Sequence, residues 1–387
     1  MSSKQSPQLY PLYKSTFSTY RVSPLYHGKA PLLSNLNVHA KRLRDEITGD
    51  SMRGIQIANE LAGITSASTA GSLQSCTWDL LGDESTWERL HASQDEDEDE
   101  ISALMAVNSQ QALGIHVQVK YERLTYSAIL LGDADRKTAV PSFTSFPLLL
   151  LKMPAALREL FLNYLATNFD ARITPMKLRP HFLSSLLEHI LDSSVSTSDS
   201  GLEVDMTAFP RGLQLQLSFP SVTPNFKNMD ISLSQEDLIQ FIRQGQTLWD
   251  QRSFTTKSPS ENLPPSKSPV TGPFTTALST YLSHHLALNF EHPAVVLDKI
   301  AIGPFAFGSD GRIKILDPSL EAQDIWKMLL EHAQVQRMQE MNDILKGTED
   351  LASQNPAAPA SRRSSRVPTE PPPPYELHDP AYRDDLG

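Results

Sequence analysis

One stretch near the start of the chain constrains the fold most: Leu9-Tyr10-Pro11-Leu12-Tyr13-Lys14-Ser15-Thr16-Phe17-Ser18-Thr19-Tyr20-Arg21-Val22-Ser23-Pro24-Leu25-Tyr26-His27-Gly28. Its middle is rich in β-branched and aromatic residues, which favour strands. From Phe17 to Val22 successive side chains can alternate between two faces. This pattern predicts a β-strand that ends at Ser23-Pro24.

A basic amphipathic helix is predicted next, from Ser34 to Ile47. Its apolar residues recur at helical spacing, at Leu36, Ala40, Leu43 and Ile47. Its outer face is positively charged and carries Lys41, Arg42 and Arg44. Gly49 is expected to end the helix, and Arg53–Ile57 is expected to form a short strand.

The clearest hairpin is predicted at Gly114–Lys120 and Leu124–Leu131, with one buried face. The alternation there sets Ile115, Val117 and Val119 against His116, Gln118 and Lys120. Residues 192–201 are expected to form a loop. Further elements are predicted in this order: helices at Ala155–Asn168 and Arg179–Leu191, strands at Gly212–Phe219 and Met229–Leu233, a helix opened by a capping box at Ser234–Asp237, a helix at Thr275–Asn289, a hairpin at Asp298–Leu316 and a helix from Ser319 to about Leu345.

The chain of 387 residues exceeds one average domain, so two folded lobes are expected, at residues 1–150 and 151–346. Biased composition predicts three disordered or exposed segments: an acidic loop near 91–101, a linker at 253–273 and a tail at 347–387. Strands and helices interleave irregularly, and hairpins favour antiparallel pairing. The sequence therefore predicts a mixed α+β fold.

Several classes of protein are disfavoured. The single cysteine, Cys76, can form no internal disulfide and no thiolate metal site, which suits a reducing compartment. No apolar run is long enough to span a bilayer. Asp317 follows a strand as a magnesium-binding kinase aspartate would, but Pro318 comes next, and the other kinase motifs are absent.

We therefore expect no catalytic residues, metal, cofactor or small-molecule substrate. The Asp310-Gly311 dipeptide before Asp317 is expected to supply the positive φ angles of a tight hairpin turn. A divergent enzyme acting near His27 and Asp317 is an alternative, although a hydrogen-bonded loop histidine is the favoured interpretation of His27.

The net charge of −11 comes from 34 basic and 45 acidic residues, and the run Asp95–Glu100 contributes six of the acids. This balance does not support a globally basic nucleic-acid binder. Local basic clusters could still contact DNA phosphate without reading the base sequence. The candidate contacts are Lys41, Arg42, Arg44, Arg53, Lys120 and Arg123. From the sequence alone an ordinary solvated surface is the favoured interpretation of each of them, because exposed lysine and arginine are common.

Two linear motifs lie in the tail. Pro372-Pro373-Pro374-Tyr375 matches the Pro-Pro-x-Tyr ligand of WW domains, with Pro372, Pro373 and Tyr375 as the defining residues. Arg362-Arg363-Ser364-Ser365-Arg366 matches a site for a basophilic kinase. The first motif supports an alternative function, that of an intracellular scaffold recruited through its tail to a WW-domain protein.

The opening block resembles the N-terminal block of the fungal CENP-L family, whose members are inner-kinetochore subunits. The same resemblance extends through His39-Ala40-Lys41-Arg42-Leu43-Arg44-Asp45 and Arg53-Gly54-Ile55. The segment Ala301–Asp317 and the helix after it look similar to the C-terminal portion of the family. The resemblance implies curved antiparallel sheets flanked by helices, no catalytic site, and a location at the centromere in the nucleus.

The resemblance also implies a CENP-N-like partner docked on the C-terminal sheet region, other inner-kinetochore partners, and a positively lined groove near centromeric DNA. An exposed sheet edge is a physically sensible route to such pairing. By this analogy the partner-binding residues are Ala301, Ile302, Phe305, Phe307, Ile313 and Ile315. The main hypothesis is thus a non-catalytic structural subunit that helps attach the kinetochore to centromeric chromatin.

Overall fold

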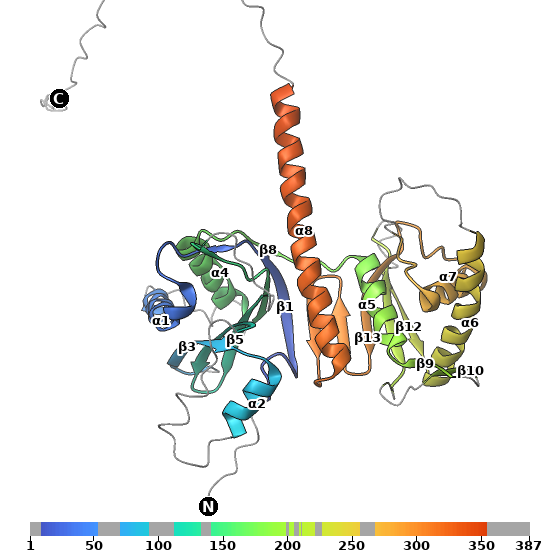
Figure 1. The fold of residues 1–387 in the computed structure, drawn as a ribbon, viewed down its shortest axis with the longest axis horizontal. Coiled ribbons are helices and arrows are strands. Elements are labelled where there is room, and N and C mark those ends of the chain that lie inside the picture. Colours follow the sequence, from blue (N-terminus) through green and yellow to red (C-terminus); the bar gives the residue numbers. More distant parts are fainter. Residues whose placement is uncertain are drawn as a thin grey trace, which may run out of the picture. The chain divides into compact units, whose positions relative to one another are not determined.

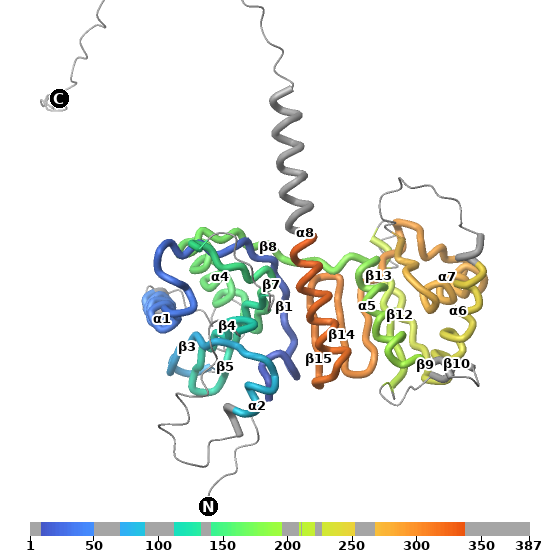
Figure 2. Tube along the Cα trace, viewed as in Figure 1, coloured from blue at the N-terminus to red at the C-terminus, as the bar shows by residue number. Residues whose placement is uncertain are grey.

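The computed structural model describes residues 9–52, 70–92, 112–132, 141–198, 201–204, 209, 211–220, 227–255 and 268–353 (Figure 2). Residues 1–339 form one compact unit, and residues 340–387 form a second. Within the second unit, residues 340–353 are the last part of helix α8. The sheets and the other helices belong to the first unit. The lobe boundary expected near residue 150 stays a prediction.

Eleven strands form one antiparallel sheet, shown with its flanking helices in Figure 1. In spatial order the strands are β12 (Asn228–Leu233), β11 (Leu213–Ser218), β13 (Val296–Ile302), β14 (Phe305–Gly308), β15 (Arg312–Ile315), β1 (Ser15–Val22), β7 (Leu148–Lys152), β5 (Thr125–Leu131), β4 (Gly114–Tyr121) and β3 (Leu73–Leu81), with β8 (Ile173–Pro175) also paired to β1. The α+β class predicted from the sequence is confirmed.

The described helices flank this sheet, and two small hairpin sheets accompany it. The helices are α1 (Leu36–Met52), α2 (Glu84–Ala92), α4 (Ala155–Phe169), α5 (Pro180–Asp192), α6 (Gln235–Thr255), α7 (Pro273–Leu286) and α8 (Leu320–Ser353), with a 3₁₀ turn at Leu32–Ser34. The small sheets pair β2 (Leu25–Tyr26) with β6 (Phe143–Thr144), and β9 (Val195–Ser198) with β10 (Gly201–Val204).

Strand β1 joins the two halves of the large sheet. Its residues 15–18 pair with β15, and its residues 18–21 pair with β7 on the other side. Residues 20–22 pair with β8. The Thr19 hydroxyl lies 2.9 Å from the carbonyl oxygen of Gly311, to which it donates. Because β15 lies near residue 315 and β7 near residue 150, the first strand of the chain holds distant segments together.

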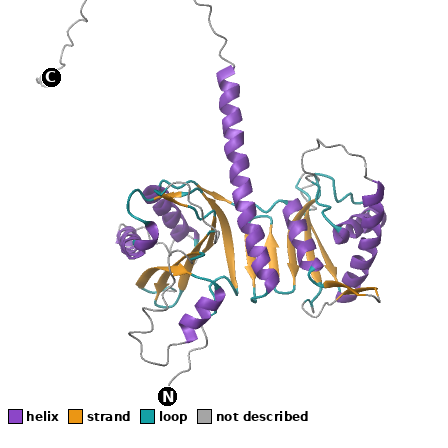
Figure 3. Cartoon of the chain, in the orientation of Figure 1, coloured by secondary structure: helices purple, strands orange, loops and turns teal. Residues whose placement is uncertain are grey.

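The side chains of β1 enter two hydrophobic cores on opposite faces of the sheet. Phe17 lies in the larger core, which α5, α6, α7 and α8 cover. Tyr20 and Val22 lie in the smaller core, which α1 and α4 cover. We call these the α8 face and the α1 face of the sheet. In Figure 3, α5 and α8 lie over the middle strands of the sheet.

Several predicted patterns are confirmed. Strand β1 ends at Val22, directly before Ser23-Pro24. The predicted apolar stripe of α1 is buried at Leu36, Ala40, Leu43 and Ile47, as are Leu213, Leu215 and Leu217 of β11. The capping box also forms, because Asp237 N donates to Ser234 Oγ (3.2 Å) and Ser234 N donates to Asp237 Oδ2 (3.3 Å).

Other expectations are wrong. Gly49 does not end α1, which continues to Met52. Residues 192–201 do not form only a loop, because part of this segment pairs in the β9–β10 hairpin. The expected hairpin at Asp298–Leu316 is a meander of three strands, β13, β14 and β15. The predicted Arg53–Ile57 strand and residues 93–101 of the acidic loop lie outside the described residues.

The turn between β14 and β15 also differs in detail from the expectation. Gly311 N donates to Gly308 O at 2.9 Å, which closes a turn over residues 308–311. Only Gly311 has a positive φ, of 84°, whereas Asp310 does not. The arrangement is that of a tight turn followed by a left-handed glycine. A Cβ on Gly311 would also clash with the Met176 carbonyl oxygen.

We expect Gly311→Ala to lower the free energy of unfolding by about 1–3 kcal/mol or more, because it adds both backbone strain and this clash. Urea denaturation of the full chain measures the change. Gly49→Ala is the matched control: it lies within α1, nothing is within 4 Å of its added Cβ, and it should stabilise by ~0.5–1 kcal/mol. Equal stability of Gly311→Ala and the natural chain would contradict this account of the turn.

His116 departs from the expected one-sided hairpin. It lies on the face of β4 opposite to Ile115 and Val117, yet its side chain is only 3% exposed. The Trp87 ring of α2 packs edge-on against it, with ring centroids 6.2 Å apart. Helix α2 was not foreseen, and it covers this part of the α8 face. Burial lowers the pKa of His116 from 6.5 to about 4.

We expect the neutral His116 to make stability depend on pH. In the unfolded chain His116 binds a proton near pH 6.5, and in the folded chain it does so only near pH 4. The stability that the neutral His116 contributes is therefore complete above pH 6.5 and is lost as the pH falls toward 4. The total loss is about 3 kcal/mol, at 1.36 kcal/mol per pKa unit. Urea denaturation from pH 7 to pH 4 should show a shallower pH dependence for His116→Leu. An unchanged slope would show that other groups, such as His332, account for the loss.

Candidate functional site

The C-terminal strands leave one face of the sheet without a covering helix among the described residues. Directly paired residues in antiparallel strands point to the same face. Thr16, which points to the α1 face, pairs with Lys314, and the row continues through Ala306, Ala301, Gln214 and Ser232. This row crosses β1, β15, β14, β13, β11 and β12 and contains no buried side chain.

A second row lies beside the first. In it Ser18 pairs with Arg312, and Lys299 pairs with Gln216, which pairs with Asp230. These side chains are also exposed or half-buried. We call the two rows together the open face: Thr16, Ser18, Gln214, Gln216, Asp230, Ser232, Lys299, Ala301, Ala306, Arg312 and Lys314.

Local sequence explains the open face. Each strand alternates, so that Leu213, Leu215 and Leu217 of β11 are buried in the core while Gln214 and Gln216 point the other way. The strands β13, β14 and β15 follow the same rule, with large apolar residues on the α8 face and small or basic residues on the open face. The apolar positions within the two rows are therefore the alanines Ala301 and Ala306.

The open face is positively charged. Lys299, Arg312 and Lys314 supply three cations, and Asp230 is the single acid of the two rows. The Asp230 carboxylate accepts a hydrogen bond from Gln216 Nε2 at 2.8 Å. At the turn, Arg312 Nε lies 3.3 Å from Asp310 Oδ2, and both side chains are more than half exposed. Such exposed pairs are weak, so Arg312 is available to an anionic partner.

The residues predicted to bind a partner do not lie at a sheet edge. They belong to β13, β14 and β15, each of which is paired on both sides. Ile302, Phe305, Phe307, Ile313 and Ile315 are buried in the core of the chain itself, and Ala301 lies on the open face. The expected edge geometry is therefore wrong for these strands. Among the described strands, β12 and β3 are the edges of the large sheet.

The predicted DNA contacts are not gathered on one face. Lys41, Arg42 and Arg44 are exposed on α1. Lys120 follows His116 and Gln118 on the α8 face, opposite to the side that α1 covers, and Arg123 lies beyond it in the β4–β5 turn. Arg53 lies outside the described residues. Whether any of these residues contacts DNA stays a prediction.

The residues weighed for catalysis lie in different surroundings. His27 Nε2 lies 3.0 Å from the Thr144 hydroxyl, while Asp317 is exposed. Burial raises the pKa of the Cys76 thiol to about 12, so it is not a thiolate at neutral pH.

Within the described ranges, no group of three or more His, Cys, Asp or Glu residues could hold a metal ion. No described helix is long and apolar enough to cross a bilayer.

The family model of centromere protein L, CENP-L, matches residues 11–352. The chain belongs to the CENP-L family. No curated protein matches it. The match includes all the strands of the large sheet, and it ends before the motif at Pro372, Pro373 and Tyr375, which lies outside the described residues. CENP-L is a structural family of the kinetochore, so the chain is a centromere component concerned with chromosome segregation.

Sequence reasoning missed the basic residues of the open face. The alternation of apolar and polar residues was visible in the sequence, and it separates Lys299, Arg312 and Lys314 from the core positions around them. This alternation does not indicate which face of the sheet a helix will cover. The pairing of β15 with β1 and the packing of α5 and α8 on one face only are tertiary facts.

Proposed function

We propose that this CENP-L protein is a non-catalytic subunit of the inner kinetochore, located in the nucleus at the centromere, that attaches the kinetochore to centromeric chromatin. Its open face contacts the DNA backbone, and the outer edge of β12 pairs with a CENP-N-like subunit. The observation that supports the DNA contact is the open face, which carries the exposed or half-buried cations Lys299, Arg312 and Lys314. The family match supports the kinetochore setting.

The chemistry of the open face suits phosphate. Lysine and arginine side chains neutralise phosphate charges, and this contact needs no base sequence. Ala301 and Ala306 leave room for a backbone to approach the sheet closely, and Thr16, Ser18 and Ser232 offer hydroxyl donors. Six of the acids lie in the run Asp95–Glu100, so the rest of the chain has 39 acidic and 34 basic residues and a formal charge of −5, and the positive charge of the open face is local.

We expect the triple variant Lys299→Gln, Arg312→Gln, Lys314→Gln to weaken binding to mixed-sequence duplex DNA. If each cation meets one phosphate, the slope of log affinity against log salt should fall by roughly 3. Fluorescence anisotropy at several salt concentrations measures this slope.

The comparison variant is Lys41→Gln, Arg42→Gln, Arg44→Gln, which removes the same charge from the contacts predicted on α1. A smaller effect of this variant supports the open face. If instead the α1 variant loses the larger slope, the contacts predicted from the sequence are the right ones. If both lose it equally, only net charge matters, and the proposal fails.

The edge of β12 is suited to pairing with another chain. In the described sheet β12 pairs with β11 on one side and with no strand on the other. An edge strand presents unpaired N–H and C=O groups, to which a partner strand can add. The six residues Ala301, Ile302, Phe305, Phe307, Ile313 and Ile315 then support the interface from within, because they build the strands behind this edge.

We expect proline scanning of adjacent residues in β12 to separate folding from assembly. Alternate residues of a strand direct their N–H groups to opposite edges. Of the two variants Ile231→Pro and Ser232→Pro, one therefore removes an N–H that bonds to β11, and the other removes an N–H that points outward. The outward variant should keep the melting temperature within a few degrees and lose co-elution with a CENP-N-like subunit in gel filtration. Full co-elution of both stable variants would rule out pairing at this edge.

A further inference from the structure

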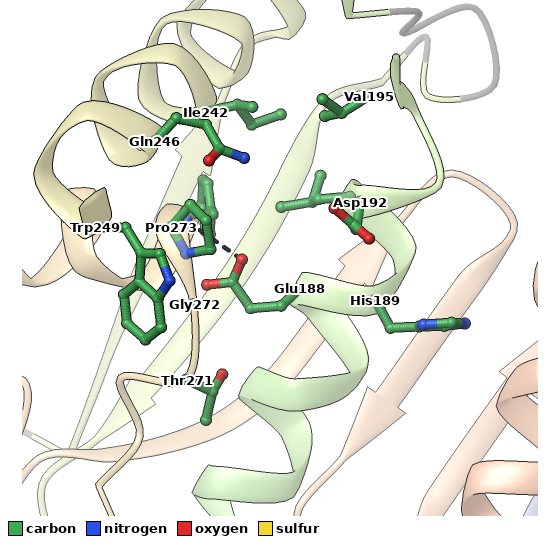
Figure 4. Close-up of a pocket in the computed structure, with 12 residues that line it drawn as sticks. Glu188, His189, Asp192, Val195, Ile242, Gln246, Trp249, Thr271, Gly272 and Pro273 are labelled. Atoms are coloured by element: carbon green, nitrogen blue, oxygen red, sulfur yellow. Dashed lines mark hydrogen bonds between the residues drawn. The ribbon is translucent and has the colours of Figure 1, made fainter. Parts of the chain in front are cut away.

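A cavity of about 220 Å³ lies between α5, α6 and the start of α7 (Figure 4). Pockets for drug-sized ligands are typically ~300–1,000 Å³, so this one suits a single side chain better than a cofactor. Most of the described residues that line it belong to helices on the α8 face. None of them belongs to the open face or to β12.

One carboxylate is fixed at the wall of the cavity. Glu188, on α5, accepts hydrogen bonds from Thr275 N at 2.7 Å, Thr275 Oγ1 at 2.6 Å and Phe274 N at 3.2 Å, and so holds the first turn of α7. Burial raises the pKa of this carboxyl and the nearby charge of Asp192 adds to the effect, while the hydrogen bonds from Thr275 oppose it. Burial and the neighbouring carboxylate therefore both disfavour the ionised form of Glu188.

The remaining polar groups of the cavity include a second carboxylate and a hydroxyl. Asp192 lies one turn beyond Glu188 on α5 and is exposed. Thr271 Oγ1 is buried, lines the cavity and has no hydrogen-bond partner among the described residues. None of the described lining residues is lysine or arginine. His189 Nε2 lies 3.7 Å from Asp324 Oδ2 of α8, a residue that does not line the cavity.

An aromatic ring and apolar side chains complete the walls. Trp249 of α6 lies across from Glu188, and Gln246 lies one turn before it (Figure 4). Ile242, Leu191 and Phe274 also line the cavity and are buried. The cavity thus combines a fixed carboxylate, a second exposed carboxylate, an unpaired hydroxyl and an indole ring.

We propose that this cavity binds the side chain of an arginine from a partner protein. A guanidinium group carries five N–H donors in one plane, which the carboxylates of Glu188 and Asp192, the Thr271 hydroxyl and the Gln246 amide oxygen can accept. The same plane stacks on the face of an indole ring. The apolar floor suits the aliphatic stem of the side chain. Lysine carries a compact charge with three donors and uses these groups less fully.

This inference extends the proposed function, because it assigns a contact to another subunit of the same assembly. Its test uses neither DNA nor a CENP-N-like subunit, so either can fail without the other. The probe is N-acetyl-arginine-N-methylamide, with the citrulline analogue as its neutral isostere. The full chain is labelled with 5-fluorotryptophan, and the Trp249→Phe variant assigns one of its four fluorine signals.

The arginine probe at millimolar concentration should shift the Trp249 signal, and the citrulline analogue should not. Asp192→Asn should raise the half-saturation concentration by roughly threefold or more. Asp250→Asn is the matched control, because Asp250 is exposed on α6 next to Trp249 but does not line the cavity. An equal response to citrulline, or equal effects of the two variants, would overturn the proposal.

The arginines at 362, 363 and 366 of the chain itself are the competing occupant. The full-length variant Arg362→Gln, Arg363→Gln, Arg366→Gln separates the two cases. An unchanged titration of the Trp249 signal supports a partner protein. Tighter probe binding in this variant shows that the tail of the chain occupies the cavity, and the assignment to a partner is then wrong.

Discussion

The structure depends on the pairing of one early strand with two distant ones. β1 pairs with β15 through residues 15–18 and with β7 through residues 18–21. Without β1 the strands β12 to β15 and the strands β7 to β3 have no ladder that connects them in the described sheet. Such pairing closes loops of well over a hundred residues, so it is supported by packing on both faces: Phe17 enters one core, and Tyr20 and Val22 enter the other.

The same pairing creates the surface on which function is proposed. Helices cover the α8 face along the large sheet, whereas α1 and α4 cover the opposite face only beside β1 and the strands from β7 to β3. Beyond β1 the α1 face continues as the open face. An antiparallel sheet tolerates one solvated face, provided that its side chains there are polar or small. The alternation of leucine and glutamine in β11 meets this condition.

Elements whose sequence pattern lies within a few residues were predicted correctly. Features that depend on contacts between distant segments were not. The strand at β1, the stripe of α1 and the capping box of α6 each depend on residues within a few positions of one another. The burial of His116 was missed because α2 and Trp87 cover a face that the alternation of β4 marks as polar. The β9–β10 hairpin was missed because serine and aspartate dominate residues 192–201, and propensity alone favours a turn there.

The sequence by itself determined the α+β class, the main elements of the sheet and, through its opening block, the resemblance to the CENP-L family that the match over residues 11–352 establishes. It could not determine the order of strands, because period and propensity carry no information on which distant strand is the neighbour. Tertiary structure alone decided that β13, β14 and β15 are interior strands, that β12 is an edge, and that Lys299, Arg312 and Lys314 share one face. A side chain is at an edge, in a core or on an open face only in relation to its neighbours, and long-range pairing supplies those neighbours.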